Sequence, residues 1–270
     1  MISRSAFVRR VWVRGLRIGD QYFRKLVRNT ILITLLTVAI YYTYLWATGH
    51  EPVEVVPTGL HSMIGFVIAL LLVFRTNTAY DRWWEGRQRL AQLHSTSIQL
   101  VALASDNPDR LATVRKVKSL LMEVKTALQI YNLTEDNIRG YRTRFRILFQ
   151  DAVYSCKDSE TRKLVLKLSD VIADCEMIKT TPIPFAYAMH IKVCLLAYIL
   201  SLPFSTFHAL GLWSALVVAF LYFLIAGIEI IANEIEDPFA GEPNDLPLDE
   251  LFGEIFSILD AIPAPKRERA

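Results

Sequence analysis

The sequence predicts an all-α integral membrane protein with four transmembrane helices in each protomer and a helical cytosolic region. The first observation is composition: 53% of the 270 residues are hydrophobic and the mean hydropathy is +0.29, more apolar than a soluble domain of this length. The second is that the hydrophobic spans form two pairs, one before and one after a long polar middle. The third is that the thirty Lys and Arg residues avoid the short loops within each pair.

The first pair of spans covers about Thr30 to Ala47 and about Thr58 to Phe74. A basic arm with one acid, Asp20, precedes them and lies next to the membrane. That position favours contact with anionic lipid headgroups over nucleic acid. The arm is too long for a cleavable signal peptide and lacks a clear small-residue cleavage site. Its basic residues are Arg4, Arg9, Arg10, Arg14, Arg17, Arg24, Lys25 and Arg28.

The second pair of spans lies in a single uncharged stretch from Val193 to Ile228. This stretch is too long for one crossing of the bilayer, which needs about 20 residues. Pro203, with Gly211 nearby, supplies a break. We therefore predict spans at about His190 to Phe207 and at about Gly211 to Ile231.

Charge distribution predicts the orientation of the spans. The loop from Thr48 to Pro57 and the turn from Phe207 to Gly211 contain no Lys or Arg. Because cytoplasmic loops carry the excess of basic residues, both termini and the polar middle are expected in the cytoplasm. An even number of spans agrees with that orientation.

The polar middle, residues 82–182, is expected to be helical. Asn107-Pro108 is typical of a helix start, and Asp158 is a candidate N-cap for a later helix. That helix should end before Pro182, and Gly140 is expected to mark a turn.

The tail, residues 232–270, is rich in Pro and acidic residues and is expected to be extended. Together with the spans and the middle it is expected to form one channel domain over residues 1–270.

Signatures of enzymes are missing from the sequence. It contains no phosphate-binding loop, no Gly-x-Ser-x-Gly and no His-Glu-x-x-His, and its five His residues are scattered. Cys156, Cys175 and Cys194 have neither metal nor redox spacing, so we interpret them as packing residues. We name no catalytic residue and no metal ligand set on these grounds, and we expect no enzyme activity.

Two features of the spans allow a functional or a structural interpretation. Phe66, Leu70 and Phe74 share one helical face, which could form a hydrophobic constriction in a pore. On spacing alone, ordinary helix packing or lipid contact explains them better. Ile183 lies between Pro182 and Pro184 in a rigid segment that could form a narrow aperture or simply start a helix.

Two charged features also allow alternatives. Arg75, at the end of the second span, is placed to bind lipid headgroups or to cap the carboxyl end of its helix. The acidic stretch from Glu234 to Asp249 does not match a calcium-binding EF-hand loop. Solvated charge is its simplest interpretation.

Two stretches carry a resemblance to a known family. FRTNTAYDRWWEGR, residues 74–87, and EIEDPFAGEPNDLPLD, residues 234–249, are similar to the motifs of bacterial bestrophin-like proteins. The resemblance covers nearly the whole chain and implies a helical homopentamer with one central pore. It also implies that Phe66, Leu70 and Phe74 line a neck and that Ile183 forms a cytosolic aperture.

The acidic tail departs from the calcium clasp of animal bestrophins. Ala240 replaces a Gly, and only Glu242, Asn244 and Asp245 remain where acids run continuously in the animal proteins. Two carboxylates argue against high-affinity calcium gating, so we expect a structural role, although calcium stays open as a cofactor. We expect no other cofactor.

The resemblance implies a passive ion channel in a bacterial inner membrane, with permeating inorganic ions, membrane lipids and its own copies as partners. Anion selectivity, for chloride, follows from the family. The predicted outer loop holds Glu51 and Glu54 without a basic residue, which favours a cation-selective channel as the alternative. A non-conducting membrane scaffold, and a transporter or lipid-linked enzyme, are further alternatives.

Overall fold

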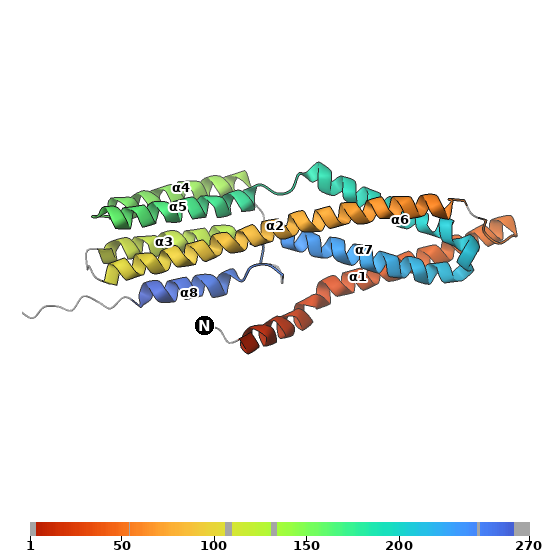
Figure 1. Cartoon of the computed structure of the whole chain (residues 1–270), viewed down its shortest axis with the longest axis horizontal. Helices are drawn as coiled ribbons and strands as arrows, with labels where there is room; N and C mark the ends of the chain where they lie inside the picture. The colour runs from red at the N-terminus through yellow and green to blue at the C-terminus, as the bar shows by residue number, and fades with distance from the viewer. Residues whose placement is uncertain (1–3, 54, 106–109, 131–133, 242–243, 262–270) are drawn as a thin grey trace, which may run out of the picture. The chain divides into compact units, whose positions relative to one another are not determined.

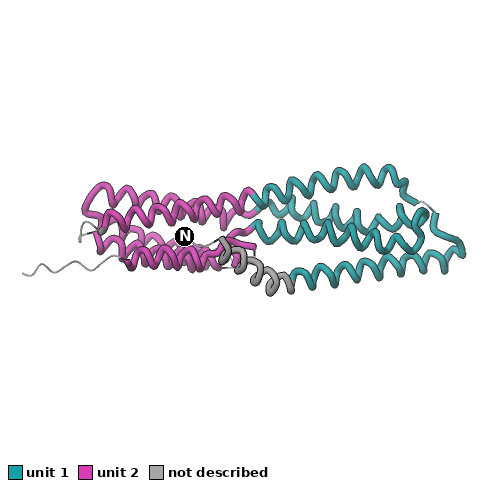
Figure 2. The backbone as a smooth tube through the Cα atoms, turned by 60° about the horizontal axis from the view of Figure 1, so that its bottom comes forward, with its two compact units in different colours: residues 1–80, 183–236 teal, residues 81–182, 237–270 magenta. Residues whose placement is uncertain are grey.

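The computed structural model describes residues 4–53, 55–105, 110–130, 134–241 and 244–261, with side chains from residue 22 onward. Every regular element in these ranges is a helix (Figure 1), as the predicted all-α class requires. The chain divides into two compact units (Figure 2). Unit 1 comprises residues 1–80 and 183–236, and unit 2 comprises residues 81–182 and 237–270.

Unit 1 is built from long apolar helices. They are α1 (Arg4–Thr48), the first part of α2 (Thr58–Ser105), α6 (Phe185–Leu210), the short 3-10 helix η2 (Gly211–Trp213) and α7 (Ser214–Glu236). Helix α7 contacts both α1 and α6. Small apolar clusters join the helices, made of Ile68, Leu72, Ile191 and Leu195 in one case and of Ile199, Leu202 and Val218 in the other.

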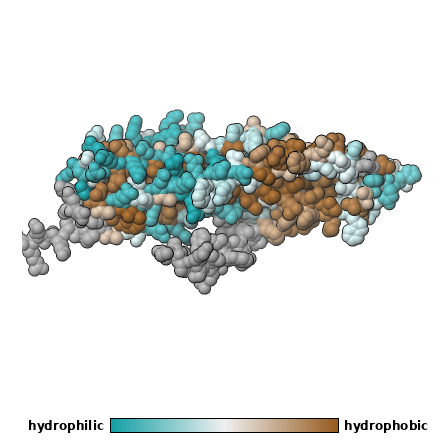
Figure 3. All heavy atoms as spheres, viewed as in Figure 1, coloured by the Kyte–Doolittle hydropathy of each residue, from teal (hydrophilic) through white to brown (hydrophobic). Residues whose placement is uncertain are grey.

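Large apolar side chains also cover the outside of unit 1. Trp46 is 88% exposed and Met63 is 69% exposed, and the helices of this unit present mostly hydrophobic residues in Figure 3. An outward apolar surface on helices is what a lipid environment requires, because their backbone polar groups are already paired. Among the residues with described side chains, three segments are long and apolar enough to cross a membrane: Tyr22–Thr48, Thr58–Ala104 and Phe185–Glu236.

The last of these segments contains two helices, α6 and α7, which contact each other and are joined by η2. The reversal occurs at Gly211, whose φ of 52° and ψ of −134° suit a residue without a side chain. Pro203 was expected to interrupt the helix, but it lies inside α6. Pro203 is buried, and the packing of α6 on α7 supports the helix through it.

Unit 2 is a helical bundle around one apolar core. It contains the second part of α2, α3 (Leu111–Leu128), α4 (Glu135–Tyr154), α5 (Ser159–Thr180) and α8 (Leu248–Asp260), with α3 contacting α4, α5 and α8. Burial raises the pKa of the Cys175 thiol to about 12 and also raises that of Cys156. Both thiols therefore stay protonated at neutral pH and pack as apolar groups, as predicted.

The predicted helix boundaries in unit 2 are partly confirmed. Asp158 caps α5, because its side chain accepts a hydrogen bond from the Thr161 backbone N–H at 2.8 Å, and α5 ends at Thr180. Gly140 does not mark a turn but lies inside α4, whose apolar face packs on α3 and α5 and outweighs the low helix propensity of one glycine. The predicted start at Asn107-Pro108 lies outside the described residues.

The tail was expected to be extended, but part of it forms a helix. Leu248 to Asp260 form α8, and Leu248, Phe252, Ile255 and Leu259 are buried along one face of it. These residues recur at three- and four-residue spacing, so the helical period outweighs the Pro-rich composition around it. Asp249 and Glu250 in the first turn favour the helix because they lie at the positive end of its dipole.

Gly86 and Gly253 form a matched pair for testing how tightly unit 2 is packed. A Cβ atom on Gly86 would lie 3.0 Å from Pro238 and 3.2 Å from Phe239, whereas one on Gly253 would meet nothing within 4 Å. We expect Gly86→Ala to destabilise the protein by about 1–3 kcal/mol through overpacking. Gly253→Ala should stabilise it by up to ~1 kcal/mol through helix propensity. Thermal unfolding in detergent measures both, and equal effects would contradict the packing of Gly86.

The N-cap of α5 predicts a pH dependence of stability. Hydrogen bonds from the Thr161 backbone and hydroxyl, together with Arg110, lower the pKa of Asp158 from 3.8 to about 2. Because the folded pKa lies below the unfolded one, the stabilisation is complete above about pH 4 and is lost as pH falls towards 2. Asp158→Ala should lower the melting temperature at pH 7, and the difference from wild type should shrink below pH 4. Asp170→Ala, which removes an exposed acid from the same helix, should show no such dependence.

Candidate functional site

Helix α2 has a packed face and a free face within unit 1. Ile68 and Leu72 are buried against Ile191 and Leu195 of α6. The three residues predicted to line a neck lie on the opposite side of the helix. Their exposed fractions in the single chain are 72% for Phe66, 44% for Leu70 and 53% for Phe74. The structure therefore presents them as an apolar stripe that the described residues of unit 1 leave largely exposed.

The residue after this stripe, Arg75, is 1% exposed. Its Nη2 donates to Asn233 Oδ1 at 2.7 Å and to Glu236 Oε2 at 2.8 Å, and its Nε lies 3.6 Å from Glu229 Oε2. The expectation that Arg75 binds headgroups or caps a helix end is wrong, since α2 continues to Ser105. A guanidinium enclosed by apolar helices needs ionic and hydrogen-bonding partners, and α7 supplies them.

The acceptors of Arg75 form one row on α7. Glu229, Asn233 and Glu236 are spaced by four and three residues, so they share a helical face. Asn233 donates to Glu229 Oε1 at 2.9 Å, and Lys192 Nζ approaches the same oxygen at 3.9 Å. Two cations and two carboxylates thus balance within the cluster. The signal that sequence reasoning missed is this spacing of acids at the end of an apolar helix.

Ile183 differs from the neck residues because it is only 7% exposed in the single chain. Its backbone N–H donates to Glu236 Oε1 at 3.3 Å, so Glu236 contacts both Arg75 and the Ile183 segment. Phe185, which begins α6 two residues later, is 76% exposed. The structure holds Ile183 in a packed segment of unit 1, and its role as an aperture stays a prediction.

The proposed remnant of a cation clasp lies in unit 2. Glu242 is outside the described residues, and the Asn244 carbonyl accepts a hydrogen bond from the Trp83 indole at 3.0 Å. Asp245 is followed by Leu246, which packs with Phe239 in the core of this unit. Among the residues that the structure describes, no group of three or more His, Cys, Asp or Glu side chains could hold a metal ion.

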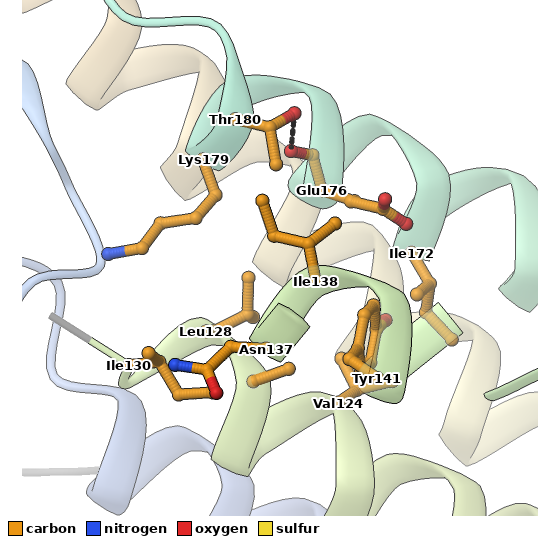
Figure 4. A pocket seen from close by; sticks show the side chains of 11 residues that line it. Val124, Leu128, Ile130, Asn137, Ile138, Tyr141, Ile172, Glu176, Lys179 and Thr180 are labelled. Atoms are coloured by element: carbon orange, nitrogen blue, oxygen red, sulfur yellow. Dashed lines mark hydrogen bonds between the residues drawn. The ribbon is translucent and has the colours of Figure 1, made fainter. Parts of the chain in front are cut away.

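A small apolar hollow lies between α3, α4 and α5 (Figure 4). Tyr141 and Ile138 line it, and burial together with the nearby Glu176 carboxylate raises the pKa of Tyr141. Lys179 also borders the hollow but pairs with Asp237 at 2.7 Å. The volume of this hollow is about 30 Å³, which admits roughly two water molecules. Ligand pockets usually measure ~300–1,000 Å³, so the hollow is too small for one.

A larger and more open hollow, of about 510 Å³, lies along α4 in the same unit. Arg139, Arg142 and Arg146 line it on one face of the helix, with Glu135 as the one acid in its lining. Arg142 Nε donates to Glu176 Oε1 at 2.6 Å. The net positive charge of the lining attracts anions to this part of unit 2.

The acidic loop that was predicted to lie outside the membrane is only partly described. Glu51 Oε2 accepts a hydrogen bond from the Tyr41 hydroxyl at 2.7 Å, while Glu54 is outside the described residues. This bond ties the loop to α1 within unit 1 and orients the Glu51 carboxylate.

Comparison with known proteins places these features in a family. A protein of Nostoc sp. named as a voltage-dependent anion channel-forming protein is 35% identical over 68% of this chain and 71% of its own length. A protein of the same name from Escherichia coli K12 is 27% identical over 89% of this chain and 88% of its own length. A bacterial bestrophin homologue from Klebsiella pneumoniae, solved as a crystal structure of a variant, shares the fold with a TM-score of 0.72. It is 21% identical, and the match covers 87% of this chain and 96% of that one.

The family model described as bacterial/fungal bestrophin protein matches residues 8–144 and 146–260. That match takes in both motifs, the apolar stripe on α2 and the row of acceptors on α7. The chain therefore belongs to the bacterial/fungal bestrophin family.

Proposed function

We propose that the chain forms a passive, anion-selective ion channel as a homopentamer. The observation that carries this proposal is the apolar stripe of Phe66, Leu70 and Phe74, which lies free on a helix whose other face is packed. Five copies of such a stripe around an axis would form stacked apolar rings. Rings of this kind gate ions by excluding water from a narrow passage. The names of the relatives from Nostoc sp. and Escherichia coli support the anion channel.

The proposed topology has four crossings, at about residues 30–47, 58–74, 190–207 and 211–231. Splitting the last apolar segment into two crossings is supported by the reversal between α6 and α7. The absence of Lys and Arg from the loop 48–57 and the turn 207–211 supports cytoplasmic termini in a bacterial inner membrane.

Two charged regions bear on selectivity in opposite directions. The three arginines that line the hollow on α4 would concentrate anions in the cytosolic part. Glu51, held by Tyr41 in a loop without basic residues, would attract cations at the outer side and supports a cation-selective channel as the second candidate. We rank the anion channel first because the relatives and the arginine-lined hollow agree.

The test of the proposal is current through a planar bilayer that contains purified protein under an asymmetric potassium chloride gradient. We expect a reversal potential near the chloride equilibrium value and pentamers by native mass spectrometry. A reversal potential near the potassium value would leave a channel but overturn the anion selectivity. Pentamers without current would contradict the channel and favour a membrane scaffold.

Leu70→Ala tests whether the stripe lines the constriction. Removing the middle side chain of the three should widen the narrowest apolar ring and let water enter it more easily. We expect the single-channel conductance to rise severalfold. Ile64→Ala removes a 42% exposed side chain on a different side of α2 from the stripe and should leave conductance unchanged. Equal conductance for wild type and Leu70→Ala would place the constriction elsewhere.

A further inference from the structure

Helix α4 pairs some of its arginines with acids and leaves others unpaired. Arg144 Nε donates to Glu123 Oε1 at 2.5 Å. Within the part of the chain that the structure describes, the side chains of Arg139 and Arg146 have no acidic partner. All three arginines are exposed, so burial does not explain the difference. Arg139 and Arg146 both line the hollow of about 510 Å³ along α4, whereas Arg144 does not.

Like charges are crowded on the side of α4 that faces this hollow. Arg139, Arg142 and Arg146 follow one another at spacings of three and four residues, so they are neighbours on one helical face. Neighbours of like charge at these spacings disfavour a helix. Arg142 is bonded to Glu176, and Glu135 is the one acid in the lining. Three guanidiniums beside two carboxylates leave an excess of one positive charge.

Guanidinium groups are the main donors that the hollow offers to a ligand. The Thr143 hydroxyl donates to the Arg139 carbonyl at 2.9 Å, and the Thr180 hydroxyl donates to the Glu176 carbonyl at 2.8 Å (Figure 4). Both hydroxyl protons are therefore already used within their own helices. A guanidinium presents its N–H groups in a planar fork that matches two oxygens of a phosphate group. Chloride has no such pair of oxygens.

We propose that the arginine-lined hollow on α4 binds the phosphate group of an anionic ligand between Arg139 and Arg146. These two residues are two helical turns apart, about 10.5 Å along the axis, and Arg142 lies between them. Their long side chains can converge on a phosphate group that lies over Arg142. The volume of about 510 Å³ leaves room for an organic part of the ligand. The site goes beyond the proposed channel function and does not depend on it.

Two sources can supply the phosphate group. Thr180, which lines the hollow, precedes Phe185 at the start of α6 by five residues. Five residues of extended chain span at most about 17 Å. Helix α6 opens a segment that is apolar enough to cross a membrane, so the headgroup of an anionic phospholipid is one source. A phosphate compound from solution is the other, because the hollow is open.

Equilibrium dialysis of labelled inorganic phosphate against the full chain in an uncharged detergent tests the site without any channel activity. Arg139→Gln/Arg146→Gln removes both unpaired guanidiniums and keeps good helix formers in α4. Arg115→Gln/Lys167→Gln is the matched control, because it removes two exposed positive charges from α3 and α5 outside the hollow. We expect the affinity for phosphate to fall at least tenfold in the first variant and to stay unchanged in the control.

Arg139→Lys/Arg146→Lys tests whether the fork of the guanidinium matters beyond its charge. Lysine keeps the positive charge but binds as a point charge, so we expect the affinity for phosphate to fall roughly threefold. This variant keeps the charge pattern of α4 and serves as the folded comparison if Arg139→Gln/Arg146→Gln unfolds. Full affinity in the lysine variant would overturn recognition by the guanidinium groups.

Native mass spectrometry after incubation with phosphatidylglycerol distinguishes the two sources. For a lipid ligand, wild type and the control should retain bound phosphatidylglycerol that Arg139→Gln/Arg146→Gln loses. For a soluble ligand, all three should retain it equally, while dialysis still separates them. Either result supports the site.

The proposal is overturned if neither phosphate affinity nor lipid retention distinguishes Arg139→Gln/Arg146→Gln from wild type. It is also overturned if Arg115→Gln/Lys167→Gln loses as much of either as the hollow variant does. In both cases the arginines of α4 are a solvated helix face that attracts anions through charge alone. Absence of current would overturn the proposed channel and leave these binding measurements unaffected.

Discussion

The pairing of Arg75 is the interaction on which the organisation of unit 1 depends. A guanidinium that is 1% exposed in the midst of apolar helices must find acceptors, since an unpaired buried charge is among the most costly defects in a fold. The acceptors come from one face of α7, so this helix is fixed in rotation and register against α2. Apolar contacts alone define neither, because hydrophobic side chains exchange partners at little cost.

With that register fixed, the two sides of α2 acquire different environments. Ile68 and Leu72 are turned towards α6, and the stripe of Phe66, Leu70 and Phe74 is turned away from it. Among the described residues of a single chain the stripe stays largely exposed. Lipid or further copies of the chain can cover it, and only further copies would convert it into the wall of a passage.

The sequence predicted the parts of this structure that follow from local patterns. The apolar helices, the Asp158 cap and the end of α5 near Pro182 depend on residues close together in the chain, and all three are found, whereas four separate crossings stay a prediction. Gly140 and Pro203 show where local rules fail, because each lies inside a helix that is supported by packing, α4 against α3 and α5, and α6 against α7. The partners of Arg75 were missed, because the spacing of Glu229, Asn233 and Glu236 marks a row of acceptors but does not say which distant cation they bind.

The neck and aperture residues illustrate a different limit. Spacing placed Phe66, Leu70 and Phe74 on one face, as the structure has them, but resemblance alone assigned them to a pore. Ile183 has no periodic pattern at all, and its burial and its bond to Glu236 become visible only when α7 is in place. The roles of these residues stay predictions that rest on the family resemblance, whereas their contacts are seen in the structure.

The distance in sequence between Arg75 and its partners has a consequence for biogenesis. Glu236 lies 161 residues after Arg75, and at bacterial rates of ~5–20 residues per second the ribosome needs roughly ten to thirty seconds to reach it. During that interval α2 is present without the side chains that neutralise its arginine. The first helical pair therefore cannot reach its final state on its own. Arg75 must stay near water or lipid headgroups until α7 emerges, so membrane insertion of this chain is completed only after synthesis of its last apolar helix.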